Sequence, residues 1–189
     1  MALSGSDTLK ITHHLRAQHT AILIGIGTLL SDDPQLTVRL VQGNDPQPVI
    51  LDSHLRTPLN ARLLQGKKLP WIITSAAAPT DREAVLVQTG ARIFRTDADQ
   101  IFIVETLNIL TREGVHSVMV EGGAGVITSF FQSRLVDLIV LTIAPCFVGG
   151  FHAVQNRLPN NSLRLDDFSM KRYENDLVVW GRPHWDAER

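Results

Sequence analysis

The sequence predicts one α/β domain over residues 1–189, with a predominantly parallel central sheet, flanking helices and an antiparallel hairpin at its C-terminal end. Short Val- and Ile-rich runs, typical of strands buried on both faces, alternate with helix-compatible segments over the first two thirds of the chain. The last third breaks this alternation, because its apolar runs follow one another without a convincing helix between them. The chain has 189 residues, of which 44% are hydrophobic and 20% charged, as expected for one globular domain.

Six apolar runs of four to six residues are predicted as buried strands. They are Ala21–Ile26, Pro48–Leu51, Trp71–Thr74, Ala91–Phe94, Val115–Val120 and Leu138–Ile143. Residues 164–173 and 177–182 are expected to pair as a hairpin, because Glu174-Asn175-Asp176 between them has turn chemistry. The segment Phe151–Leu163 is predicted as a surface loop.

Four segments between these runs are predicted as helices. They are Lys10–Gln18, Thr80–Thr89, Gln100–Glu113 and Gly125–Leu135. Thr80 precedes two acidic residues and is the expected N-cap of its helix. Gly90 and Gly114 follow the second and third segments, where glycine commonly ends a helix.

Composition excludes several classes of partner. The formal net charge is −1 and no cluster of five or more like charges occurs, so no nucleic-acid partner is expected. No apolar stretch reaches the roughly 18 residues of a membrane span. The first ten residues lack the order of a signal peptide, so we expect a soluble cytoplasmic protein without a membrane partner. The histidines are not spaced as metal ligands, and Cys146, the only cysteine, is predicted to be a buried, inert thiol.

The most informative segment is Val120-Glu121-Gly122-Gly123-Ala124-Gly125. A buried strand precedes it and a helix-like segment follows it, so the glycines lie at a strand-to-helix turn. Such a turn presents free N–H groups and the positive end of a helix dipole to a phosphate. It also occurs simply to pack a helix closely on a strand, and the segment by itself leaves both interpretations open.

Two more segments follow predicted strands. Residues 25–39 read G-I-G-T-L-L-S-D-D-P-Q-L-T-V-R, either a ligand-binding loop or a strand-to-helix turn with Ser31 or Asp32 as a cap and Pro34 as a stop. Residues 51–58 read L-D-S-H-L-R-T-P, in which Ser53 and Arg56 could hold a phosphate or belong to an ordinary polar loop. Strand ends in open α/β sheets line the ligand crevice, so both segments are candidates.

Six collinear motifs give the chain a specific resemblance to a known family. They are L-R-A at 15–17, A-I-L-I-G-I-G-T at 21–28, D-D-P-Q-L-T-V-R at 32–39, V-I-L-D-S-H-L-R-T-P at 49–58, V-M-V-E-G-G-A at 118–124 and L-T-I-A-P-C-F-V-G-G at 141–150. The chain resembles the pyrimidine reductases of riboflavin biosynthesis, above all the stand-alone fungal and archaeal kind, over nearly its whole length. No H-x-E…P-C-x-x-C signature of the zinc deaminase that is fused to many bacterial relatives is present.

The resemblance implies a dihydrofolate-reductase-like fold, a homodimer and an NADPH-dependent reduction. Members of the family reduce the ribosylamino group of a pyrimidine 5′-phosphate to a ribitylamino group, with a hydride delivered to the sugar C1′. The substrate is therefore a small phosphorylated pyrimidine, in either its diamino or its deaminated form. A reductase of the same fold acting on another imine or on a folate-like molecule is a further alternative.

Cofactor positions carry over residue by residue from the resemblance. Thr28 and Asp32 match residues beside the cofactor and the reaction centre, and Ser53 matches a cofactor contact. The segment that wraps the NADPH pyrophosphate corresponds to Gly122, Gly123, Ala124, Gly125, Val126, Ile127, Thr128 and Ser129. For the 2′-phosphate of the cofactor, Ser75, Arg56 and Arg95 are alternatives.

Substrate positions carry over in the same way. Glu121 matches a carboxylate that contacts substrate, and Arg16, Leu36 and Arg39 match substrate positions, where the arginines suit the phosphate end. Protonation must accompany hydride delivery, and Asp32 and Glu121 are the carboxylates considered for it, directly or through water.

The chain departs from the family at its N-terminal end. Members usually begin with a further strand whose motif is close to S-L-D-G-K-I-A, and Met1 to Gly5 correspond to the segment after it. We expect its absence to expose Ile22, Ile24 and Val118. Three explanations of the missing strand are open. The chain is shortened, a neighbouring subunit fills the gap, or the protein is a non-catalytic paralogue that serves as a nucleotide-binding protein or dimer scaffold.

Overall fold

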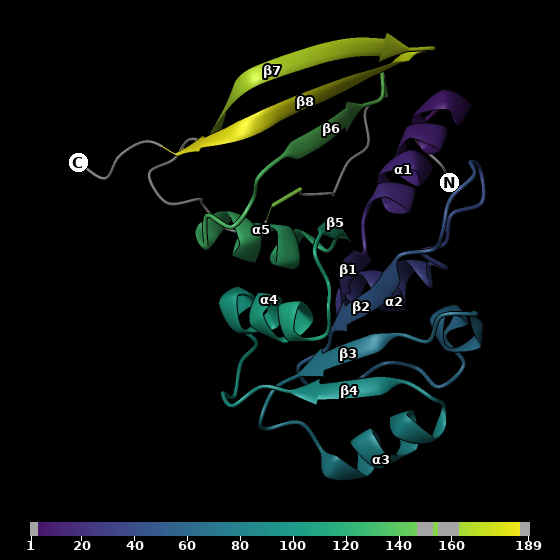
Figure 1. The fold of residues 1–189 in the computed structure, drawn as a ribbon, viewed down its shortest axis with the longest axis vertical. Helices are drawn as coiled ribbons and strands as arrows, with labels where there is room; N and C mark the ends of the chain where they lie inside the picture. The colour runs from purple at the N-terminus through teal and green to yellow at the C-terminus, as the bar shows by residue number, and fades with distance from the viewer. Residues whose placement is uncertain (1–3, 147–152, 155–162, 186–189) are drawn as a thin grey trace.

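The computed structural model describes residues 4–146, 153–154 and 163–185 of the chain. Two sheets occupy different levels along the long axis, a larger one with most of the helices below and a smaller one above (Figure 1). The predicted loop Phe151–Leu163 lies almost entirely outside the described residues. None of the helices in the described part has the length and apolar character that crossing a bilayer requires.

The larger sheet has five strands, all parallel, in the order β4-β3-β2-β1-β5. Its strands are β1 (Ala21–Gly25), β2 (Gln47–Leu51), β3 (Trp71–Thr74), β4 (Arg92–Arg95) and β5 (Val118–Gly122). Each was predicted as a strand, and the parallel pairing confirms the α/β class. The start of β5 was placed three residues early: Val115 is buried within the connection between the preceding helix and β5 and is not part of the strand.

The described residues form five α-helices and one short 3₁₀ helix. They are α1 (Ser6–Gln18), α2 (Ile26–Asp32), η1 (Arg62–Gln65), α3 (Thr80–Gln88), α4 (Ile103–Arg112) and α5 (Ala124–Gln132). The predictions of α1, α3, α4 and α5 are confirmed, with differences at the ends. The expected cap at Thr80 is wrong, because Pro79 holds the N-cap position and Thr80 is the first helical residue.

Helix α2 was not predicted. It begins at Ile26, directly after its N-cap Gly25, and ends before Asp33, which takes the left-handed conformation with φ 39°. The interpretation of Ser31 or Asp32 as an N-cap is therefore wrong, because both residues lie in the last turn of a helix. Ile26 and Leu29 are three residues apart and both buried, which is the period of one helix face.

Helices cover both faces of the parallel sheet, because successive side chains of a strand point to opposite faces. Ile22 and Ile24 of β1 pack in one cluster with residues of α2, η1 and α3. Ala21 and Leu23 of the same strand pack in a second cluster with residues of α4 and α5. A strand with both faces buried therefore reads as a continuous apolar run in the sequence.

The smaller sheet is antiparallel and has the order β6-β8-β7, with β6 (Ile139–Ile143), β7 (Leu163–Tyr173) and β8 (Asp176–Trp185). The predicted hairpin is confirmed, with its turn at Glu174-Asn175. β6 is half-buried to exposed, so its predicted burial on both faces is wrong; β4, at the edge of its sheet, is also only partly buried. Cys146, which follows β6, is exposed, so the prediction of a buried thiol is wrong as well.

The two sheets are not joined by strand pairing in the part of the chain that is described. β5 pairs only with β1, and β6 pairs only with β8. Ile22 and Ile24 were expected to be exposed and are fully buried, because β1 lies between β2 and β5. Val118 of β5, the strand at the open edge, is half-buried.

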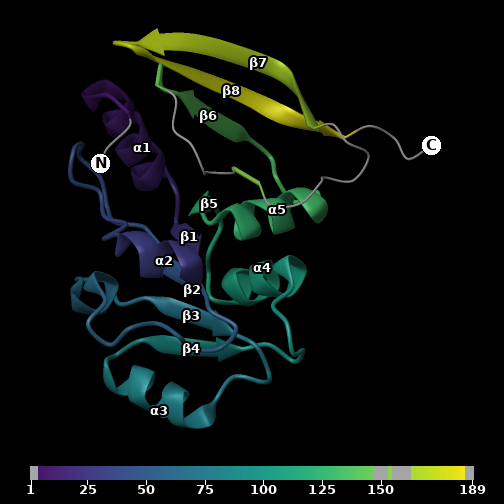
Figure 2. The same cartoon turned by 180° about the vertical axis from the view of Figure 1, so that it is seen from behind.

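Helix α1 spans the distance between the two sheets, as both views show (Figures 1 and 2). At its start the Gly5 N–H donates to Asp176 Oδ2 at 2.8 Å, beside the hairpin turn of the smaller sheet. At its end the chain passes directly into β1, which lies between β2 and β5 in the larger sheet. This course brings the side chains of α1 against the end of β5.

Candidate active site

Three loops meet at one edge of the parallel sheet. β2, β1 and β5 are neighbours and parallel, so their carboxyl ends point the same way. Ser53 follows β2, α2 follows β1, and the turn Gly122-Gly123 follows β5. The structure thus brings the three candidate segments to the same edge of the sheet.

The glycine turn leads directly into the N-terminus of α5. Gly123 is the N-cap, with φ 83°, and no side chain among the described residues caps the helix. The first helical hydrogen bond is donated by Ile127 N–H to Gly123 O, at 3.0 Å. The N–H groups of Ala124, Gly125 and Val126 have no acceptor within the helix, which fits them to hold the oxygens of an anionic group such as a diphosphate.

Thr28 of α2 faces this turn. A Cβ atom on Gly123 would lie 3.3 Å from Thr28 Oγ1, and one on Gly122 would lie 3.4 Å from it. A Cβ atom on Gly25 would lie only 2.7 Å from Val126 Cγ2, so the starts of α2 and α5 pack closely because Gly25 is small. Asp32 is exposed and comes four residues after Thr28, on the same face of α2.

The later residues of the predicted cofactor segment have side-chain contacts to their own helix and to the core. Thr128 is buried and its hydroxyl donates to Ala124 O at 2.7 Å. The hydroxyl of Ser129 donates to Gly125 O at 3.0 Å. Val126 packs in the core and Ile127 is half-buried. Residues 122–125 are thus the part of the segment whose backbone is best suited to meet a ligand.

Glu121 is the extra residue of a bulge in β5, since Leu23 pairs with Val120 and Ile24 with Gly122. Both of its carboxylate oxygens accept hydrogen bonds from Arg16 of α1, from Nε at 2.5 Å and from Nη2 at 2.6 Å. The two side chains are only 12% and 15% exposed for Arg16 and Glu121 respectively. This bidentate ion pair fixes both groups immediately before the glycine turn.

The segment after α2 lies beside this pair. Arg16 Nη1 donates to Thr37 O at 3.0 Å. Arg39 is exposed, and its Nη1 donates to Gln35 Oε1 at 2.7 Å and to Thr37 Oγ1 at 2.8 Å. Leu36 has its side chain in the core, 2% exposed, and a positive φ of 53°. Leu36 is therefore buried as a whole residue, and its strained backbone conformation lies at a candidate site.

The three alternatives for a 2′-phosphate differ in their surroundings. Ser75 is buried and its hydroxyl donates to Ser53 O at 2.8 Å. Arg95 donates to the carbonyls of Ser75, Ala76 and Ala78 and forms an ion pair with Glu83. Arg56 is exposed at the end of its loop. Arg56 is thus the more accessible of the two arginines.

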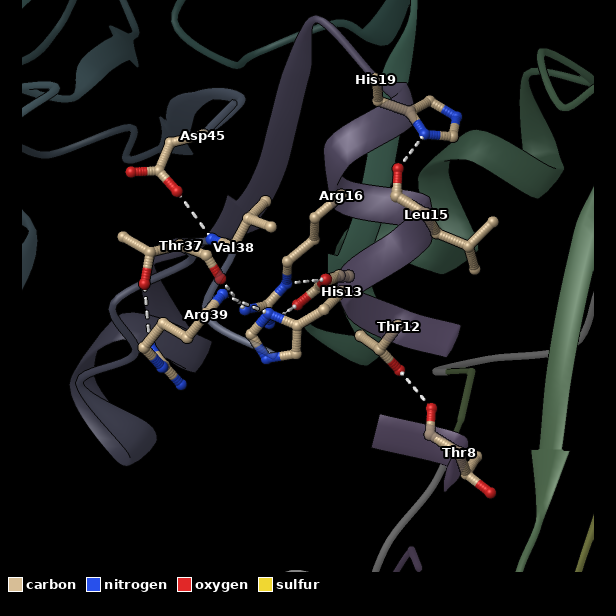
Figure 3. Close-up of polar contacts among 11 residues, drawn as sticks. Thr8, Thr12, His13, Leu15, Arg16, His19, Thr37, Val38, Arg39 and Asp45 are labelled. Carbon is tan, nitrogen blue, oxygen red and sulfur yellow. Dashed lines mark hydrogen bonds and ion pairs between the residues drawn. The ribbon is translucent and has the colours of Figure 1, made fainter. Parts of the chain in front are cut away.

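Two residues of this region, His13 and Asp45, were not predicted from the sequence. His13 is 5% exposed, and its Nδ1 accepts the Arg39 N–H at 3.0 Å (Figure 3). Asp45 Oδ1 accepts the Val38 N–H at 2.6 Å. His13 comes three residues before Arg16, and this spacing could have shown that the two side chains lie on one face of the helix. The backbone groups that they contact belong to a loop without periodicity, so the contacts themselves were not predictable.

Comparisons with known proteins identify the family of the chain. The family model of the RibD C-terminal domain matches residues 1–179. A protein of Archaeoglobus fulgidus named 2,5-diamino-6-ribosylamino-4(3H)-pyrimidinone 5′-phosphate reductase is 35% identical over 160 residues, covering 79% of this chain and 73% of that protein. A Candida glabrata protein of the same name is 31% identical over 198 residues, covering 95% of this chain and 79% of that protein.

Among solved structures, the riboflavin biosynthesis reductase Rib7 of Saccharomyces cerevisiae superposes with a TM-score of 0.76 at 26% identity. The superposition covers 95% of this chain and 82% of the yeast chain. The parallel sheet, the flanking helices and the antiparallel hairpin are therefore those of the dihydrofolate-reductase-like fold. Sequence motifs, architecture and family model agree, and the chain belongs to the RibD C-terminal domain family, whose relatives are named as reductases of riboflavin biosynthesis.

Proposed function

We propose that this protein is an NADPH-dependent reductase that converts the ribosylamino group of a pyrimidine 5′-phosphate to a ribitylamino group in riboflavin biosynthesis. One observation carries the proposal: the Arg16–Glu121 pair lies immediately before an uncapped helix N-terminus. A polar substrate site and an anion site are thereby adjacent in the chain. The names of the relatives supply the substrate class.

One group of residues is proposed to bind the cofactor. The N–H groups at 124–126 hold the diphosphate of the cofactor, and Thr28 closes against the same turn. Ser53 lies at the neighbouring strand end, and exposed Arg56 is the proposed partner of the 2′-phosphate. When it is bound, NADPH supplies the hydride.

The substrate side is formed by Arg39 and by the Arg16–Glu121 pair. Arg39 is the proposed cation for the 5′-phosphate, because it is exposed and Arg16 is already engaged by Glu121 and Thr37. For the proton that accompanies reduction we favour Asp32 over Glu121. A proton on Glu121 would require one of its bonds to Arg16 to break, whereas Asp32 is exposed.

A direct assay tests the activity. Purified protein is mixed with NADPH and the ribosylaminopyrimidine phosphate, in diamino and deaminated forms, and the absorbance of the reduced nicotinamide is followed. We expect substrate-dependent oxidation with one of the two forms. Oxidation no faster than in the absence of protein would contradict the proposal.

A second candidate function is nucleotide binding without turnover. The open edge of β5 beside Glu121, unpaired within the described residues, favours it, because the site then has one wall fewer to exclude water. Calorimetric titration with NADPH separates the two candidates: binding together with an inactive assay supports the second.

The smaller sheet also suggests a homodimer. Phe168 and Met170 are 63% and 60% exposed, and Leu141 and Ile143 of β6 are 46% and 45% exposed. Clusters of exposed apolar side chains commonly mark interfaces between subunits. Sedimentation equilibrium measures the state, and a monomer at assay concentration would contradict this part of the proposal.

Arg39→Ala is expected to raise the substrate KM about tenfold or more, since charge-assisted contacts to a phosphate contribute roughly 1.5 to 3 kcal/mol. The KM for NADPH should stay unchanged, because Arg39 lies on the substrate side. Arg112→Ala, which removes an exposed arginine at the end of α4, is the matched control and should leave both constants unchanged. Equal effects of Arg39→Ala on both constants would refute the assignment.

A further inference from the structure

The segment between α2 and β2 contains no helix or strand, and its centre is held by ionisable side chains at three successive residues. Arg16 Nη1 donates to Thr37 O at 3.0 Å. The Val38 N–H donates to Asp45 Oδ1 at 2.6 Å, and the Arg39 N–H donates to His13 Nδ1 at 3.0 Å (Figure 3). These contacts take the place of the ladder or helix bonds that would otherwise satisfy this backbone.

Two of the three contacts come from one face of α1. His13 and Arg16 are three residues apart and lie side by side on the helix (Figure 3). Arg16 is in turn fixed by Glu121, at the end of β5. The backbone of the Arg39 segment is thus connected through α1 to the residue that precedes the glycine turn.

His13 can make its contact in only one protonation state. Its Nδ1 accepts the Arg39 N–H, so that nitrogen carries no proton and the ring is neutral with its hydrogen on Nε2. An imidazolium has N–H groups on both nitrogens and would face the Arg39 N–H with a second donor. The contact is therefore lost on protonation.

The surroundings of His13 favour this neutral form. Burial lowers the pKa of His13 below its ordinary value, and the charges of Arg16 and Arg39 lower it further. Glu121 and Asp45, the carboxylates that also act on the ring, shift the pKa in the opposite direction and are outweighed. Neutral His13 is accordingly the resting form at neutral pH.

We propose that His13 is a positioning residue: by accepting the Arg39 N–H it fixes the backbone from which the Arg39 guanidinium reaches the substrate phosphate. The phosphate part of this inference rests on the proposed function. The backbone part does not, because it follows from the contact itself. His13 acts through Arg39, with no contact to substrate of its own.

The sign of the pH dependence follows from the lowered pKa. The folded protein binds the His13 proton less readily than the unfolded chain. The stabilising contact is therefore fully present above the unfolded pKa of about 6.5 and is lost as the pH falls through the lower pKa of the folded state. Protonation of the substrate phosphate, whose second pKa is about 6, also weakens binding in that range. A non-titrating acceptor at position 13 separates the two effects.

Three variants test the proposal. His13→Asn places an amide oxygen near the position of Nδ1 and does not titrate. His13→Ala removes the acceptor. His14→Ala, at the adjacent and exposed position of α1, is the matched control. Thermal unfolding of each variant first establishes that it is folded.

The primary readout is hydrogen exchange of the Arg39 amide, measured by NMR and corrected for its intrinsic pH dependence. We expect His13→Ala to increase exchange about tenfold, as for the loss of one hydrogen bond. His13→Asn and His14→Ala should stay near the wild-type rate. As the pH falls through the pKa of His13, which lies below its ordinary value of about 6.5, the wild type should lose protection, whereas His13→Asn should not. The ring nitrogen spectrum should show an unprotonated Nδ1 at neutral pH.

The kinetic readout is the substrate KM, expected to rise in His13→Ala with the KM for NADPH unchanged, and to recover in His13→Asn. Unaltered Arg39 exchange in His13→Ala, or a proton on Nδ1 at neutral pH, would overturn the inference even if Arg39→Ala raises the substrate KM. Faster exchange of the Arg39 amide in His13→Ala would support the backbone part of the inference, whatever the effect of Arg39→Ala. If Arg39→Ala then leaves the substrate KM unchanged, only the proposed phosphate contact is refuted.

Discussion

Gly123→Val is expected to abolish tight nucleotide binding, with the Kd for NADPH raised at least tenfold. Gly123 is the N-cap of α5, and a side chain at an N-cap lies over the first free N–H groups of the helix. Valine would cover those groups with methyls, and its Cβ would lie 3.3 Å from Thr28 Oγ1. The positive φ of 83° adds a strain of about 1 to 3 kcal/mol for a β-branched residue. Calorimetry measures the affinity, and denaturant unfolding measures the stability.

Gly114→Val is the matched control for the strain. Gly114 has φ 82°, close to that of Gly123, and a Cβ atom there would meet nothing within 4 Å. We expect a loss of stability similar to that of Gly123→Val, but an unchanged affinity for NADPH. If Gly123→Val binds NADPH as the wild type does, the anion site at this turn is refuted. The anion site is also refuted if Gly114→Val loses as much affinity for NADPH as Gly123→Val does, because backbone strain would then explain the loss.

Glu121→Ala is expected to lower the free energy of unfolding by about 2 kcal/mol, less than the roughly 3 to 5 kcal/mol typical when one partner of a fully buried pair is removed. It leaves the Arg16 guanidinium, 12% exposed, without its bidentate acceptor. The freed arginine also no longer fixes Thr37, so substrate turnover should fall at least tenfold even where the variant is folded. Urea unfolding and the reductase assay measure the two effects.

The chain offers a control pair that is more exposed. Arg92 Nη2 and Glu113 Oε2 are 2.8 Å apart, with side chains 54% and 30% exposed. Glu113→Ala should therefore cost less than about 1 kcal/mol and leave turnover unchanged. A loss of stability in Glu121→Ala no larger than in Glu113→Ala would contradict the structural role of the Arg16–Glu121 pair.

A double variant separates fold from function at the same site. Arg16→Met with Glu121→Leu removes both charges and keeps apolar volume, so part of the lost stability should return. Turnover should stay low, because the double variant has neither the Glu121 carboxylate that is proposed to contact substrate nor the Arg16 guanidinium that holds Thr37. Turnover near the wild-type level in this double variant would show that the ion pair is dispensable for the reaction.

The fold class was predictable because its signals are local. Runs such as Ala21–Ile26 and Trp71–Thr74 are uniformly apolar because helices cover both faces of the sheet, and that burial is recorded in consecutive residues. Helix α2 was missed because it has only seven residues and two buried positions, too few for a period to be recognised. The exposure of β6 and of Cys146 was missed because apolar composition does not reveal which sheet a strand joins.

Some features of the candidate site were likewise predictable from the local sequence, and others depended on the tertiary structure. The sequence by itself determined the α/β class, the hairpin and the glycine turn between β5 and α5, because each depends on residues adjacent in the chain. Only the tertiary structure decided that Arg16 pairs with Glu121, 105 residues away, and that His13 holds the backbone of Arg39. Those contacts depend on the course of α1 between the two sheets and on a bulge in β5, and no local pattern of residues specifies either.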